Sequence, residues 1–299
     1  MAEKIIIDTD IGDDVDDALA IALALRSPEL EVAGITTVYK NVAQREQLAL
    51  TLLDVYGRRD IPVAVGFGKP IRYETDTSAI PHQCRNLRNK IERNCDSDAV
   101  SFIIESVRKD PAIILVAIGP YTNIGMAVKL APEIMRGVRV VGMGGAFSAV
   151  YPEYNIMCDP EAVNILLKSE CRIEMVGLDV TVKCVLSPDD LAGIKQCREA
   201  EHQFLGGLID IWMDTSIGKK VTLHDPLTVA YLIDPGILTM KMEPVDVELE
   251  GTFTRGLTAV LRTPFRQRKP LPPDNVNVAV DVDFPRLRSL VLRRVFGIQ

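Results

Sequence analysis

The sequence lacks the features that mark several common classes of protein. Its six cysteines are spread over 299 residues without a CxxC pair, unlike the dense framework of a disulfide-rich secreted domain. No apolar run reaches the ~18 residues of a membrane span. The apolar stretch near the N-terminus is short and broken by acids, unlike a signal peptide. We therefore expect a cytoplasmic protein with reduced thiols and no membrane partner.

Basic residues are fewer than acidic residues. There are 34 lysines and arginines against 41 aspartates and glutamates, which gives a net charge of −7. Six of the acids stand within residues 8–17, and without them 34 basic residues would face 35 acidic ones. The remainder of the chain is balanced, which argues against nucleic acid or an anionic membrane as a partner. The acidic segment contains Asp8, Asp10, Asp13, Asp14, Asp16 and Asp17.

Short apolar runs alternate along the chain with stretches rich in helix-forming residues. Parallel strands that are covered on both faces read as such runs, and helices connect them. The alternation predicts an α/β fold with a mostly parallel, mixed central sheet flanked by helices, in a single domain over residues 1–299. The polar residues 67–97 are expected to form a surface excursion. Strands are expected at 4–8, 30–38, 61–66, 112–119, 138–143, 172–180 and 276–282, and helices at 17–25, 42–56, 98–109, 123–130, after 160 and at the C-terminus.

The acidic segment follows the first expected strand and leads into the first expected helix. In open α/β sheets, ligands bind at the carboxyl ends of the strands. Six carboxylates so close together repel one another strongly unless a partner neutralises them. The dipole of a helix offsets only about half an elementary charge. A hard divalent cation, which prefers oxygen ligands, is the partner that resolves the repulsion.

Several other interpretations of the acidic segment compete with a metal site. A solvated turn in which Asp16 caps the helix stays open. An EF-hand is excluded, because Gly12 breaks the aspartate ladder and no glutamate closes a twelve-residue loop. The DDxxD pattern of prenyl-diphosphate enzymes lies within a helix, whereas this segment follows a strand. The serious alternative is a Mg²⁺-dependent Asp-x-Asp phosphatase with Asp8 as nucleophile, although the later lysine and aspartate of such enzymes have no obvious counterpart.

Five segments resemble the inosine–uridine preferring nucleoside hydrolase family, in that family's order. The first, DTDIGDDVDDALA, resembles its DxDPGxDDA signature. Five ordered matches are not expected by chance, and they imply the Rossmann-like nucleoside hydrolase fold. The other four are ITTVYKN (35–41), IGPYTNIGMA (118–127), PEYNIMCDPEA (152–162) and LHDPLTVA (223–230), which resemble TTVxGN, GPLTNIALA, AEFNIxxDPEAA and HDPLAVA.

The resemblance implies hydrolysis of the N-glycosidic bond of ribonucleosides, in nucleoside salvage, with one Ca²⁺ per subunit. By resemblance, the ion is held by Asp10, Asp17, the main-chain carbonyl of Thr122 and Asp225. Asp10 would then take a proton from the metal-bound water as general base. His224 would protonate the departing base, or else it packs against Asp225. The family also implies a homodimer or homotetramer.

A second group of residues is expected to contact the substrate. A site that hydrogen-bonds hydroxyl groups rejects analogues without them, so 2′-deoxyribonucleosides should be poor substrates. His82 and Trp212 are weaker candidates for the edge of the base pocket. The residues that the resemblance assigns to the ribose and its surroundings are Asp16, Asn41, Met143, Glu153, Tyr154 and Asn155.

The chain departs from the family pattern at several points. The signature is two residues longer than usual, which leaves Asp13 and Asp14 without an assigned role unless they bind a second ion. Lys40 stands where the family usually has glycine. A short stretch before residue 152 lacks a clear asparagine for the ribose 5′-hydroxyl, and residues 85–94 are basic, so a phosphorylated or modified nucleoside stays open. A non-catalytic nucleoside- or ion-binding member of the fold is the non-enzyme alternative.

Overall fold

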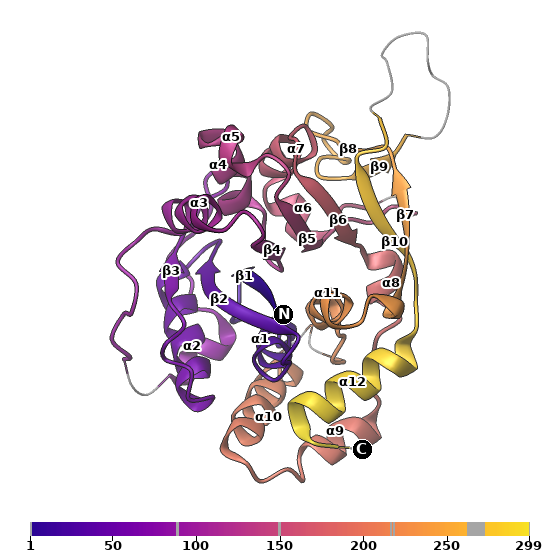
Figure 1. Cartoon of the computed structure of the whole chain (residues 1–299). Helices are drawn as coiled ribbons and strands as arrows, with labels where there is room; N and C mark the ends of the chain where they lie inside the picture. Colours follow the sequence, from indigo (N-terminus) through magenta and orange to yellow (C-terminus); the bar gives the residue numbers. More distant parts are fainter. Residues whose placement is uncertain are drawn as a thin grey trace.

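Ten strands build two sheets in the computed structural model, which describes residues 2–87, 90–148, 151–215, 217, 219–261 and 273–298 (Figure 1). The larger sheet has the strand order β3-β2-β1-β4-β5-β6-β10-β7, in which only β7 runs antiparallel to its neighbour. Its strands are β1 (Glu3–Thr9), β2 (Leu30–Thr37), β3 (Val63–Val65), β4 (Ile114–Ala117), β5 (Arg139–Met143), β6 (Arg172–Val176), β7 (Leu238–Glu243) and β10 (Val276–Val282). The smaller sheet pairs β8 (Val245–Val247) with β9 (Thr258–Val260).

Helices cover both faces of the larger sheet. Alternate side chains of β1 point to opposite faces, so Ile5 and Ile7 join one buried apolar cluster and Ile6 joins the other. The first cluster includes α1 (Asp16–Leu25), α2 (Val42–Val55), α10 (Ala200–Met213), α11 (His224–Ile233) and α12 (Phe284–Phe296). The second includes α3 (Ala99–Lys109), α4 (Thr122–Leu130) and α7 (Pro160–Leu167). The shorter helices are η1 (His82–Asn86), α5 (Pro132–Met135), α6 (Tyr154–Cys158), α8 (Leu178–Thr181), α9 (Pro188–Ile194) and η2 (Pro235–Ile237).

The sheet has a topological switch point between β1 and β4. The chain runs outward from β1 through β2 to β3 and then returns to place β4 on the other side of β1. The loops after β1 and β4 therefore diverge at the carboxyl edge, where such sheets bind ligands. Gly119 lies against this edge, because an added Cβ there would meet the backbone nitrogen of Asp10 at 2.8 Å.

The predicted α/β fold and mixed sheet are confirmed, with three corrections. The strand expected at 172–180 ends at Val176, and Leu178–Thr181 form α8. Residues 67–97 are more than a surface excursion, because η1 packs inward with Gln83 and Cys84 buried. The strands β7, β8 and β9 were not expected. Within the basic segment 85–94, residues 88 and 89 lie outside the described residues.

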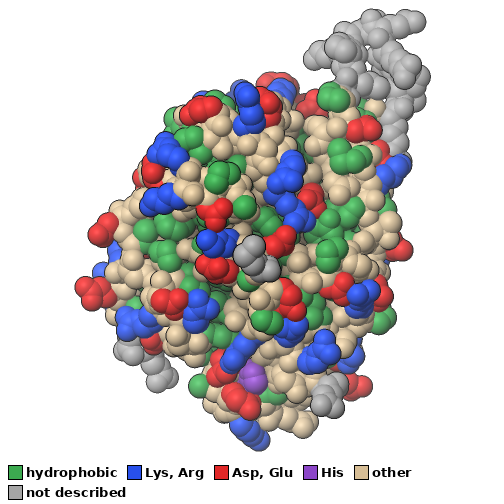
Figure 2. All heavy atoms as spheres, viewed as in Figure 1, with side chains coloured by type: hydrophobic (Ala, Val, Ile, Leu, Met, Phe, Trp, Pro, Cys, Tyr) green, Lys and Arg blue, Asp and Glu red, His purple; other side chains and the backbone are tan. Residues whose placement is uncertain are grey.

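Two further features bear on the sequence-based expectations. All six cysteines are free thiols. Within the described part of the chain, no helix combines the length and the apolar character that crossing a membrane requires. On the face shown in Figure 2, acidic and basic side chains are interspersed rather than gathered into one basic patch.

Candidate active site

A cavity of about 430 Å³ lies at the carboxyl edge of the sheet, beside the switch point. Thirteen of the fifteen residues proposed from the sequence line it, and they come from segments up to 215 residues apart. Four further lining residues are Lys40, Ile118, Leu178 and Ile217. The thirteen are Asp10, Asp13, Asp14, Asp16, Asp17, His82, Met143, Glu153, Tyr154, Asn155, Trp212, His224 and Asp225.

Two helix N-termini bring three carboxylates together at this cavity. Asp16 and Asp17 begin α1, and Asp225 lies in the first turn of α11, which packs against α1 (Figure 1). Each of the three offers an oxygen within 4.8 Å of the others, and all three residues are buried. The Asp16 carboxylate accepts a hydrogen bond from the backbone amide of Asp225 at 3.4 Å. The positive ends of both helix dipoles favour negative charge here, but only in part.

The electrostatics of this cluster call for a cation. Burial, together with the charges of the neighbouring aspartates, raises the pKa of Asp16, Asp17 and Asp225 well above the ordinary range. Burial likewise raises the pKa of Asp10 to about 6, against the opposing charge of Arg45. Carboxylates that resist ionisation in isolation become a favourable ligand set once a divalent ion lies between them. An oxygen-only donor set of this kind fits Ca²⁺.

Asp8 is buried and does not line the cavity. It is 1% exposed and is absent from the residues that line the cavity. Its carboxylate accepts hydrogen bonds from the Thr36 hydroxyl at 2.5 Å and the Asn123 amide at 2.7 Å. These bonds tie β1 to β2 and α4. A buried side chain in this position cannot reach a phosphoryl group in the cavity, which counts against Asp8 as the nucleophile of a phosphatase.

One wall of the cavity combines His224 with apolar side chains. The His224 ring nitrogen Nδ1 lies 2.7 Å from the Thr181 hydroxyl of α8, and burial lowers the pKa of His224 to about 4. The neutral imidazole is therefore the form present at neutral pH. The indole N–H of Trp212 donates to the Lys220 carbonyl at 2.9 Å, and Trp212 lines the cavity. Leu178 and Ile217 are further apolar residues of the lining.

Another part of the cavity wall is built around Glu153. Its carboxylate caps α6 by accepting from the backbone amides of Gly145, Asn155 and Ile156 at 2.8–3.2 Å. Burial raises the pKa of Glu153 to about 7. The Asn155 amide donates to the Met143 carbonyl at 3.4 Å. This wall therefore holds polar groups whose backbone partners fix their orientation.

Lys40 is the cation that the cavity wall contains. Its ammonium donates to the Tyr154 hydroxyl at 3.2 Å and lies 5.1 Å from the centre of the Tyr39 ring. Tyr39 and Lys40 both have positive φ, 67° and 55°, which is costly for residues other than glycine. The strained turn places Lys40 in the lining of the acidic cavity.

Two of the expected site residues, Thr122 and Asn41, are not among the residues that line the cavity. Thr122, whose main-chain carbonyl is the expected ligand, begins α4 and is not among the residues that line the cavity, and its hydroxyl donates to Asp159 at 2.6 Å. Ile118, which directly follows β4, lines the cavity instead. Asn41 caps α2 by accepting from the Gln44 amide at 3.3 Å, and its own amide donates to the Ser78 carbonyl.

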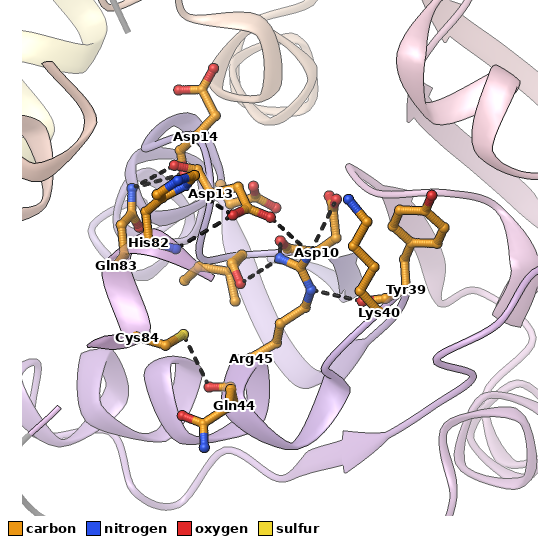
Figure 3. A network of polar contacts seen from close by, with 12 residues as sticks. Asp10, Asp13, Asp14, Tyr39, Lys40, Gln44, Arg45, His82, Gln83 and Cys84 are labelled. Carbon is orange, nitrogen blue, oxygen red and sulfur yellow. Dashed lines mark hydrogen bonds and ion pairs between the residues drawn. The ribbon is translucent and has the colours of Figure 1, made fainter. Parts of the chain in front are cut away.

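Arg45 is a site neighbour that the sequence did not reveal. It projects from the first turns of α2 and is fully buried beneath the turn that carries Asp10 and Asp13 (Figure 3). A single arginine in a helix normally reads as a solvated residue, and no local pattern distinguishes this one.

Fold and site together define the class of protein: a doubly wound α/β enzyme with an acidic, oxygen-rich cavity at its switch point. Comparison with known proteins identifies the family. The chain matches the inosine–uridine preferring nucleoside hydrolase family over residues 5–289. It belongs to that family and is an N-glycosyl hydrolase.

Individual relatives agree with this assignment. The inosine-uridine preferring nucleoside hydrolase of Crithidia fasciculata is 34% identical, over 98% of this chain and 97% of the relative. The pyrimidine-specific ribonucleoside hydrolase RihA of Citrobacter koseri is 32% identical, over 99% and 98%. A solved purine-preferring ribonucleoside hydrolase from Gardnerella vaginalis has a TM-score of 0.85 and 33% identity, with 98% of each chain covered. The plant nucleoside hydrolase PpNRh1 has a TM-score of 0.88 and 31% identity, over 99% of this chain and all of the other.

Proposed function

We propose that the chain hydrolyses the N-glycosidic bond of ribonucleosides, to ribose and free base, with one Ca²⁺ bound at the floor of the cavity. The observation that carries the proposal is the buried carboxylate cluster of Asp16, Asp17 and Asp225. It lies in a member of a nucleoside hydrolase family, in a cavity that has room for a nucleoside.

The ligands that we propose for Ca²⁺ are Asp10, Asp17 and Asp225. A main-chain carbonyl from the end of β4 would complete the protein's share. Ile118 lines the cavity and Thr122 does not, so we assign that carbonyl to Ile118. When bound, the ion supplies a water of lowered pKa and binding positions for ribose hydroxyls. Asp16, Glu153 and Asn155 are then placed to orient the ribose.

Asp10 is the proposed general base. A pKa of about 6 leaves its carboxylate ionised at neutral pH and able to take the proton of the attacking water. The water attacks the anomeric carbon through an oxocarbenium-like transition state. Direct attack by water, without a covalent intermediate, inverts the anomeric centre.

His224 is the proposed partner of the departing base. Because its pKa is lowered to about 4, it acts as a neutral hydrogen-bond donor rather than as a preformed imidazolium. If the Thr181 hydroxyl donates to Nδ1, the proton of the imidazole sits on Nε2. This nitrogen would then donate to the base as negative charge develops on it. Trp212 and Ile217 would contact the faces of the base.

The experiment is a reducing-sugar assay on a panel of purine and pyrimidine ribonucleosides. We expect ribose release that a chelator abolishes and Ca²⁺ restores, and that Asp10→Ala reduces by at least ~100-fold. No ribose from any ribonucleoside would contradict the proposal. Phosphate release from phosphate esters that requires Mg²⁺ would favour the phosphatase, and tight nucleoside binding without turnover would favour the non-catalytic alternative.

The biological setting follows from the same proposal. We propose that residues 1–299 act as one domain in nucleoside salvage and that the six free thiols reflect the reducing cytoplasm. The homodimer or homotetramer expected from the family stays a prediction, which sedimentation velocity would test. The cavity gives no preference for purines or pyrimidines, because relatives with either preference share its fold.

A further inference from the structure

Arg45 joins the loop after β1 to the loop after β2. Its side chain is 1% exposed. Its Nε donates to the Tyr39 carbonyl at 2.8 Å, and its Nη1 donates to the carbonyls of Asp10 and Ile11, the latter at 3.0 Å. The guanidinium thus fixes three backbone positions, two after β1 and one after β2, with its planar fork. Figure 3 shows the side chain reaching from α2 to the underside of this turn.

Asp13 supplies the charge partner of this buried arginine. Its carboxylate accepts from Arg45 Nη2 at 3.1 Å, whereas the nearest oxygen of the Asp10 carboxylate is 4.0 Å away. Asp14 does not take part: it points away from the guanidinium in Figure 3, and its carboxylate accepts from the Val15 amide at 2.6 Å. A buried cation requires a hydrogen-bonded counter-ion. Asp13 meets that need with a hydrogen bond, whereas the Asp10 carboxylate lies farther from the guanidinium; both residues line the cavity.

The same turn is held from its other side by η1. The backbone N–H of Gln83 donates to the Gly12 carbonyl at 2.9 Å, and the side-chain amide of Gln83 donates to the Asp14 carbonyl at 3.0 Å. Gly12 has φ of 133° and touches Pro81 so closely that an added Cβ would lie 2.8 Å from the Pro81 ring. Residues 10–14 are therefore held by hydrogen bonds from Arg45 and from η1.

We propose that Arg45 and Asp13 form a clamp that positions Asp10, with Arg45 as the positioning residue and Asp13 as its counter-ion. This inference rests on the proposed function for its consequence at the metal site. It gives the lengthened acidic signature a use, since Asp13 stands in the two-residue excess. Arg45 holds the backbone of Asp10 in place, and Asp13 prevents the guanidinium from drawing the Asp10 carboxylate out of the cavity.

The test uses the full-length protein, stripped of metal by a chelator. Arg45→Lys retains the charge but not the fork, Arg45→Met removes the charge, and Asp13→Asn removes the counter-ion. We expect hydrogen–deuterium exchange to accelerate in peptides that cover residues 8–17 and to stay unchanged in peptides from β10 and α12. The matched control is Arg93→Met, because Arg93 pairs with Glu46 of the same helix α2 at 2.7 Å but is half exposed. It should leave residues 8–17 unchanged.

Calcium affinity, measured by calorimetry, gives the second readout. We expect the dissociation constant to rise at least ~10-fold in Arg45→Lys and Asp13→Asn, as for other residues that orient metal ligands. Asp14→Asn removes the same charge from the same turn without touching Arg45, so hydrogen–deuterium exchange in residues 8–17 should accelerate less in Asp14→Asn than in Asp13→Asn. Equal acceleration in these two variants would overturn the role of Asp13.

The outcomes separate the clamp from the proposed function. Unchanged exchange in residues 8–17 in folded Arg45→Lys protein would overturn the clamp, even if the wild type hydrolyses nucleosides. A wild-type protein without turnover or calcium binding would refute the proposed function. Hydrogen–deuterium exchange in residues 8–17 of the variants would still show whether the clamp exists. Should Arg45→Met fail to fold, Arg45→Lys and Asp13→Asn carry the test.

Discussion

Asp8 leads to a quantitative prediction for the stability of the calcium-free protein. Its carboxyl group is 1% exposed, and its Oδ2 has no hydrogen-bond partner among the described residues. Burial raises the pKa of Asp8 from 3.8 to about 7, against the opposing hydrogen bonds from Thr36 and Asn123. The native protein therefore keeps a proton on Asp8 over a range of pH in which the unfolded chain releases it.

The sign of the effect follows from the raised pKa. The stabilising contribution of Asp8 is complete below the unfolded pKa of 3.8 and is lost as pH rises through about 7. Each pH unit in this window costs ~1.4 kcal/mol. The group therefore removes about 4 kcal/mol from the free energy of unfolding between acidic and neutral pH.

Asp8→Asn tests this reasoning. Asparagine is neutral at every pH, has nearly the same shape, and keeps an oxygen that can accept from Thr36 and Asn123. The free energy of unfolding of the variant, relative to wild type, should rise by about 4 kcal/mol from pH 4 to pH 8. Urea denaturation in the presence of a chelator, at each pH unit in this range, measures it. A difference that stays constant with pH would refute the reasoning.

The control for this experiment is an exposed aspartate. Asp60 pairs with Arg58 at 2.9 Å on the surface, and the hydrogen bonds from Arg58 lower the pKa of Asp60. Its carboxylate therefore stabilises the protein at neutral pH and not in acid. Asp60→Asn should show no gain in relative stability as pH rises.

Three further predictions concern the site. Gly119→Ala should lower the free energy of unfolding by ~1–3 kcal/mol, because the added methyl would lie 2.8 Å from both the Asp10 backbone nitrogen and the Val38 side chain. Gly206→Ala on α10, with open space around it, should not destabilise the protein in the same thermal melts. His224→Ala should lower kcat on inosine or uridine by ~100-fold or more but act little on 4-nitrophenyl riboside, whose leaving group needs no proton; equal losses would contradict leaving-group activation. The kcat/KM for 2′-deoxyuridine should fall ~10⁴-fold below that for uridine, and comparable values would remove the role of Asp16 and the ion at the 2′-hydroxyl.

Much of the fold was predictable because it depends on local patterns. Strands buried on both faces must be largely continuous apolar runs, and the apolar runs within β1, β4 and β5 are of this kind. The antiparallel strand β7 was missed because four of its six residues are exposed or half-exposed, so it has no apolar run. The end of β6 was extended too far because residues 177–180 have the composition of a strand although they turn into α8.

The site was predictable where side chains carry its chemistry. Asp10, Asp17 and Asp225 were assigned by motif, and all three line the cavity. The main-chain carbonyl, expected from Thr122, is harder to assign from a motif. Every residue has a carbonyl, and only the path of the chain decides whether that of Ile118 or that of Thr122 faces the cavity. Asn41 presents a similar difficulty, because a residue before a helix serves equally as a cap or as a ligand, and in the structure Asn41 caps α2.

The burial of Arg45 could not be read from the sequence. Its position in α2 gives no signal, and its counter-ion stands 32 residues earlier. Only the folded arrangement shows that Asp13, which has no evident use in the sequence, neutralises a charge beneath the cavity. The excess negative charge of residues 8–17 is thus neutralised in part by the buried Arg45, and we propose that Ca²⁺ neutralises the rest.

The most direct test of the central claim measures ribose release and bound calcium on the same samples. Metal-stripped wild-type protein should be inactive on ribonucleosides, and activity should return in proportion to the Ca²⁺ bound, up to one ion per chain. Asp225→Asn, which removes one buried carboxylate of the cluster, should lose both calcium binding and ribose release. Full ribose release from the metal-stripped protein, or from an Asp225→Asn variant that binds no calcium, would contradict the account.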